Sequence, residues 1–93
     1  MPINRKNLEE KERKEKVALD ELGREIKSFL QNNPEEMFVF EEISESVKYP
    51  ELFQGYDKYR KIGVVAGALA YLDLHEEIVK MENESVYYYG IKR

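Results

Sequence analysis

The segment over residues 57–91 constrains the fold most, because it predicts a helix that passes directly into a β-hairpin. Asp57 can cap this helix, since a carboxylate there accepts hydrogen bonds from the free N–H groups of the first turn. Four aliphatic residues recur at spacings of three and four and so share one helical face: Ile62, Val65, Leu69 and Leu72. Residues 78–81 and 86–91 are rich in β-branched and aromatic residues, and Asn83 between them tolerates the positive φ of a tight turn.

A second amphipathic helix is predicted over residues 17–31, where five apolar residues form one stripe. The stripe consists of Leu19, Leu22, Ile26, Phe29 and Leu30. Gly23 interrupts the stripe and indicates a close approach between two helices. Residues 32–34, Asn-Asn-Pro, end the helix, because Asn accepts a left-handed backbone and Pro cannot continue a helix.

Shorter elements are predicted between these two helices. Residues 37–40, Met-Phe-Val-Phe, favour a short strand that pairs with the C-terminal hairpin. A third strand is expected because a two-stranded hairpin alone is only marginally stable in water. Residues 41–47 favour a short helix, and Pro50 followed by Gly55 indicates one extra helical turn in the connection over residues 48–56.

The N-terminal stretch over residues 4–16 is nearly all charged. Acidic and basic residues stand four apart in it, as Glu10 and Lys14 do, which supports a solvated helix. We therefore divide the chain into a charged helical extension, residues 1–16, and a folded domain, residues 17–93. Three interpretations of the extension stay open: a frayed or disordered tail, a basic arm on a nucleic-acid backbone, or a helix that pairs with a second subunit.

Several function classes are disfavoured by composition. The chain has no cysteine and a single histidine, His75, so we expect no disulfide, no metal site and no cofactor. No nucleophile stands beside a base in a recognisable motif, and we expect a protein that is not an enzyme. No run approaches the ~20 apolar residues of a membrane span, and the N-terminus lacks a signal-peptide stretch, so a cytoplasmic protein is expected.

Two segments resemble the winged helix-turn-helix superfamily: residues 38–43, Phe-Val-Phe-Glu-Glu-Ile, and residues 69–79, Leu-Ala-Tyr-Leu-Asp-Leu-His-Glu-Glu-Ile-Val. The resemblance implies an α+β fold with a three-helix core, a three-stranded antiparallel sheet and, here, the N-terminal extension. It also implies a small prokaryotic transcriptional regulator that binds double-stranded DNA as a homodimer. A narrower similarity, of residues 38–40 and 89–92 to the small dissimilatory sulfite reductase D proteins, implies instead an accessory protein that docks on other proteins.

The resemblance implies a set of DNA-binding residues. They lie at the start of the predicted recognition helix, on the hairpin and on the extension: Lys58, Tyr59, Arg60, Lys61, Lys80, Arg5, Lys6, Arg13 and Lys14. Three features depart from a DNA-binding pattern. The connection over residues 48–56 is long, Glu82 and Glu84 make the hairpin tip acidic, and residues 35–57 carry seven acidic residues against one lysine, a net charge of −6.

The helix over residues 57–72 also presents an alternative site. At about 100° per residue, the face opposite its apolar stripe carries Arg60 and then no further side chain of the kinds that read base edges. Small residues instead leave a groove, which consists of Gly63, Val64, Gly67 and Tyr71. Such a groove favours the approach of a phosphate backbone or of another helix, or it is a tolerated surface. The second of these makes the protein a protein-docking module that does not bind nucleic acid.

Overall fold

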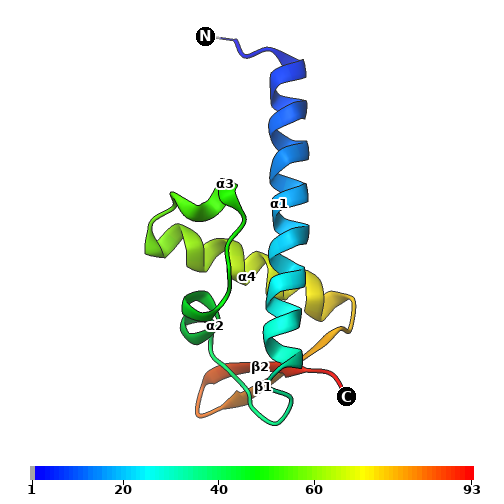
Figure 1. The fold of residues 1–93 in the computed structure, drawn as a ribbon, viewed down its shortest axis with the longest axis vertical. Helices are drawn as coiled ribbons and strands as arrows, with labels where there is room; N and C mark the ends of the chain where they lie inside the picture. Colours follow the sequence, from blue (N-terminus) through cyan, green and yellow to red (C-terminus); the bar gives the residue numbers. More distant parts are fainter. Residues whose placement is uncertain (1) are drawn as a thin grey trace.

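The structure, a computed structural model, describes residues 2–93, which form four helices and one β-hairpin. In chain order these elements are α1 (Arg5–Gln31), α2 (Phe40–Ser46), α3 (Glu51–Gln54), α4 (Lys58–Leu74), β1 (Ile78–Asn83) and β2 (Val86–Ile91). Figure 1 shows α1 as a long rod whose N-terminal half projects away from the rest of the chain, with α4 crossing its C-terminal half. The molecule is accordingly elongated, with extents of 49 × 24 × 23 Å.

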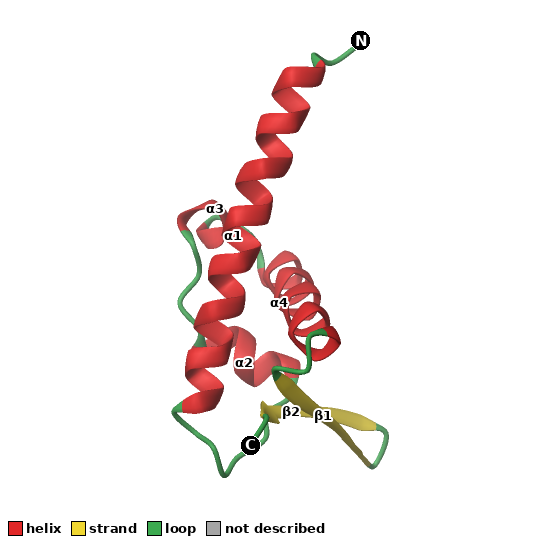
Figure 2. Ribbon diagram, turned by 90° about the vertical axis from the view of Figure 1, so that its right-hand side faces the viewer, coloured by secondary structure: helices red, strands yellow, loops and turns green. Residues whose placement is uncertain are grey.

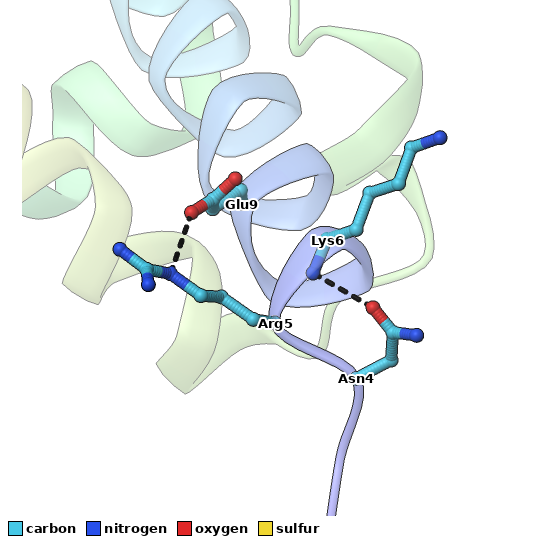
Figure 3. A network of polar contacts seen from close by, with 4 residues as sticks. All are labelled: Asn4, Arg5, Lys6 and Glu9. Carbon is cyan, nitrogen blue, oxygen red and sulfur yellow. Dashed lines mark hydrogen bonds and ion pairs between the residues drawn. The ribbon is translucent and has the colours of Figure 1, made fainter.

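Helix α1 runs without a break through the predicted extension and into the predicted domain. It begins at Asn4, whose side-chain oxygen accepts a hydrogen bond from the Lys6 N–H at 2.8 Å (Figure 3). Arg5 and Glu9 form an ion pair at 3.1 Å one turn further on. The predicted apolar stripe is confirmed in part: Leu22, Ile26 and Leu30 are fully buried, Phe29 is half-buried and Leu19 is exposed.

Helix α4 and its cap are confirmed. An oxygen of the Asp57 side chain accepts the Arg60 N–H at 2.9 Å and so satisfies one free donor of the first turn. Val65, Leu69 and Leu72 of the predicted stripe are buried, whereas Ile62 is only half-buried. The chain leaves α4 through Glu76, which has a left-handed φ of 57°, and turns into β1.

The predicted winged helix-turn-helix with a three-stranded sheet is wrong, although the α+β class and the extra helical turn, α3, hold. The sheet has only two strands, β1 and β2, which pair antiparallel from Ile78 opposite Ile91 to Asn83 opposite Val86 (Figure 2). Within residues 37–40 only Phe38 pairs with the hairpin through its backbone, in an isolated bridge to Tyr89.

Helix α2 explains the missing strand. It begins at Phe40, and the side chain of Glu42 accepts the Val39 N–H at 3.0 Å, so these residues form a helix N-terminus. The aromatic rings of Phe38 and Phe40 pack in the core and not on the face of a strand. Phe38 packs on Phe29 with ring centroids 4.8 Å apart, and Phe40 packs on Tyr89 at 5.1 Å.

The turn of the hairpin also differs from the prediction. Positive φ angles fall on Glu84 and Ser85, at 52° and 67°, and not on Asn83. Two consecutive left-handed residues are typical of the two-residue turn whose twist matches that of the flanking strands.

No helix within residues 2–93 is both long enough and apolar enough to cross a bilayer.

Candidate functional site

One side of α4 is open to solvent along its whole length. We define the open face of α4 by its seven exposed residues: Tyr59, Arg60, Gly63, Gly67, Ala70, Tyr71 and Leu74. Large apolar side chains stand at its two ends, where Tyr59 is 84% and Leu74 is 78% exposed. Small residues fill the middle, and Arg60 is the only charged residue on this face.

The predicted DNA-binding residues at the start of α4 lie against aromatic rings. The guanidinium of Arg60 stands 3.9 Å above the centroid of the Tyr56 ring, and the Lys61 ammonium lies 5.2 Å from that of Tyr49. The Tyr49 hydroxyl donates to the Ser44 carbonyl at 2.8 Å, which fixes this ring. Lys58 and Tyr59 are exposed beside them. The first turn of α4 is therefore a cluster of basic and aromatic side chains with partly fixed orientations.

The remaining predicted DNA contacts are spread over the molecule. Lys80 lies on the hairpin, with its ammonium 4.8 Å from the Tyr87 ring centroid. Lys14 borders a shallow hollow together with Tyr56, and so approaches the basic cluster of α4. The other three predicted contacts on α1 are exposed: Arg5, Lys6 and Arg13. Arg5 and Lys6 belong to the first turn of α1, at the end that projects away from the body (Figures 1 and 3).

A crevice of about 480 Å³ lies where α1 crosses α4. Its walls are apolar or small and come from both helices: Leu19, Gly23, Gly67, Ala68, Tyr71 and Leu72. Its rim is charged and consists of Lys16, Asp20, Arg24, Lys27 and Glu77. Across this rim the Lys27 ammonium contacts a Glu77 carboxylate oxygen at 2.8 Å.

The predicted groove of α4 is thus divided between two hollows. Gly67 and Tyr71 line the crevice, whereas Gly63 and Val64 line a more open hollow of about 340 Å³ beside Arg60. The close helix approach predicted at Gly23 is wrong, because a Cβ added there would meet no atom within 4 Å. The α1 half of the crevice was missed from the sequence, and the glycine in an apolar stripe was its one signal.

Within residues 2–93 no three His, Cys, Asp or Glu side chains gather as they would around a metal ion. His75 stacks on Tyr71 with ring centroids 4.3 Å apart. Burial, with smaller contributions from the Asp73 carboxylate and from Tyr87, raises the pKa of the Tyr89 phenol above its usual value.

Comparisons with family models, with curated proteins and with solved structures found no match, so the function is argued below from this chain alone.

Proposed function

We propose that this protein is a small, non-catalytic docking module that packs the open face of α4 against a helix of a partner protein. The observation that carries the proposal is the exposure of large apolar side chains at both ends of that face, Tyr59 and Leu74. Burial of such side chains is favourable by about 25 cal/mol per Å² of apolar surface removed from water. A partner helix that covers this face would remove these side chains, and the half-exposed ring of Tyr71 between them, from water.

The middle of the face favours a helix as the partner. Gly63, Gly67, Ala70 and Leu74 follow spacings of four, three and four, which is the seam along which two helices pack. Small residues at such a seam let two helix backbones approach closely, because the distance between helix axes depends on the side chains at the contact.

The order of residues along the face favours a second copy of the same chain. In an antiparallel pair of α4 helices, Tyr59 of one copy stands opposite Leu74 of the other, and Gly63 stands opposite Ala70. Gly67 then lies next to the two-fold axis. Large residues meet large ones and small meet small, which is the self-complementarity that a symmetric homodimer requires.

Mass in solution tests this proposal. We expect sedimentation equilibrium to give twice the 11.1 kDa of the chain, and Ala70→Glu to return the mass to that of one chain. Glu is a good helix former and Ala70 is exposed, so the variant keeps its fold while placing two like charges in the contact. The matched control is Ser28→Glu on the exposed side of α1. A wild-type monomer at every concentration, or an Ala70→Glu dimer, contradicts the proposal.

DNA binding is the second candidate, supported by the cluster of Lys58, Arg60 and Lys61 at the first turn of α4. The test is the affinity for duplex DNA as a function of salt, for the wild type and for the triple alanine variant. A DNA-binding protein loses affinity steeply as salt rises, and the variant reduces that slope. An absence of binding at about 50 mM salt leaves the docking proposal alone. We propose a cytoplasmic location with either candidate.

A further inference from the structure

The crevice between α1 and α4 shares Gly67 and Tyr71 with the open face and extends from there onto α1. Two glycines are among its lining residues, Gly23 of α1 and Gly67 of α4. A Cβ added at either position would meet no atom within 4 Å, so the space above both glycines is open. The volume of about 480 Å³ falls within the range typical of pockets for small organic ligands.

Both glycines lie in helix interiors, where glycine is less favourable than alanine. Neither is required by its backbone, since no glycine among the described residues has a positive φ. Neither is required by packing, because an alanine would fit at both sites without a clash. Both line the crevice, and a larger side chain at either position would enter its open space.

The lining of the crevice defines the chemistry of its ligand. Leu19, Leu72 and the ring of Tyr71 offer apolar contacts to an apolar body. The rim holds three basic side chains, Lys16, Arg24 and Lys27, against two acidic ones. None of the ion pairs within residues 2–93 involves Lys16, Arg24 or Asp20, so two positive charges and one negative charge leave the rim with a net positive charge.

The ion pair between Lys27 and Glu77 also favours an anionic ligand. Lys27 and Glu77 are each only 35% exposed, so the Lys27 ammonium is partly shielded from water. Charges interact more strongly where water is partly excluded. An anionic group that reaches Lys27 from inside the crevice would share this ammonium with Glu77 and gain a charge-assisted hydrogen bond.

We propose that the crevice binds an amphipathic organic acid. Its apolar body lies over Gly23 and Gly67 between Leu19 and Tyr71, and its carboxylate meets the ammonium of Lys27 at the rim. The apolar lining suits an aliphatic body and an aromatic body alike, and titration with one acid of each kind distinguishes the two.

Calorimetric titration with decanoate tests the site, with naphthalene-2-carboxylate as the aromatic arm and decanol as the uncharged match. We expect saturable binding of at least one of the two acids, with NMR shifts at the Gly23 and Gly67 amides. The acid that binds more tightly shows whether the apolar body of the ligand is aliphatic or aromatic. Decanol is expected to bind about tenfold more weakly than decanoate, because it lacks the charged hydrogen bond.

Three variants make the test specific. Gly23→Leu fills the crevice from α1, away from the open face, and is expected to weaken acid binding by about tenfold or more while the mass in solution stays that of the wild type. Lys27→Gln is expected to weaken binding of the acid but not of decanol. Ser28→Leu on the exposed side of α1 is the control and binds as the wild type does.

Two results would overturn the inference: no saturable binding of either acid, or equal binding by Gly23→Leu and the wild type. Gly23 lies outside the open face, so Gly23→Leu alters the crevice without altering the proposed dimer contact. Conversely, Ala70→Glu tests docking and leaves the crevice intact, since Ala70 is not among its lining residues.

Discussion

The two halves of α1 belong to one continuous helix but are held by different forces. The outer half, residues 5–16, contains no buried residue, and its polar contacts are the Asn4 cap and one exposed ion pair. The inner half, residues 17–31, holds all the buried residues of α1: Ala18, Leu22, Gly23, Ile26 and Leu30. The first helical turn is the costly step of helix formation, and later residues add one hydrogen bond each. The packed inner half therefore nucleates a helix that the outer half only extends.

The same substitution in each half gives the largest expected contrast. Leu22 is fully buried whereas Leu8 is 40% exposed. Leu22→Ala should lower the free energy of unfolding by about 2–5 kcal/mol, because it removes core contacts and leaves a cavity. Leu8→Ala should change it by less than about 0.5 kcal/mol. Urea denaturation measures both, and equal losses would mean that the outer half packs against a partner in solution.

Alkaline pH should destabilise the core against which the inner half of α1 packs. Tyr89 of β2 is buried, and burial raises the pKa of its phenol above the usual value of 10.0. A folded-state pKa above the unfolded one means that stability is fully present below the unfolded pKa and is lost as pH rises through the folded pKa. The free energy of unfolding should therefore fall above about pH 10.

Tyr89→Phe should flatten this loss, because it removes the group that ionises. Tyr59→Phe, on a side chain that is 84% exposed, is the control and should keep the alkaline loss of the wild type. If Tyr89→Phe loses stability above pH 10 as steeply as the wild type, another group causes the loss.

A smaller change, in this case an increase in stability, is expected for a substitution at Gly23. Alanine is more favourable than glycine in a helix interior by about 1 kcal/mol, and the added methyl group meets no atom within 4 Å. Gly23→Ala should thus raise the melting temperature. Gly90→Ala is the contrasting variant, because its Cβ would lie 3.3 Å from Met37 Cγ and 3.4 Å from the Glu36 carbonyl oxygen. A drop in melting temperature for Gly23→Ala would show that the two helices are closer in solution.

The smallest expected change in stability comes from a substitution in the outer half of α1. Glu9→Gln removes the exposed ion pair with Arg5, and exposed pairs four apart contribute about 0.3–0.5 kcal/mol. Faster amide hydrogen exchange should appear near Glu9, with the exchange of Ile26 unchanged. Faster exchange at Ile26 and Glu9 alike would indicate that the two halves unfold as one unit.

Elements that follow from local chemistry were predictable from the sequence. The period of Val65, Leu69 and Leu72, and the carboxylate of Asp57, predict α4 and its start, because both signals act within a few turns. The hairpin follows likewise from two β-branched and aromatic runs. Residues 37–40 carry an equally good strand signal, but the start of α2 competes for Phe40, and tertiary packing of the aromatic rings decides the outcome.

The candidate sites were predictable only in part, because they depend on how two helices cross. Gly63, Gly67 and Tyr71 lie on the solvent side of α4 as their spacing predicts. The division of this groove into two hollows depends on α1, which passes over α4 at Leu19. The residue pattern of one helix does not show where another helix crosses it, so the crevice could be found only from the structure.

The hairpin tip gives the chain a place that tolerates engineering. Glu84 and Ser85 both hold a left-handed backbone, which L-residues other than Gly and Asn adopt at a cost. Asn-Gly at these two positions would remove that cost and lock the register of the ribbon. Since the tip is exposed and lies outside both the crevice and the open face, a dye or an epitope could be grafted there as a reporter that leaves either binding reaction undisturbed.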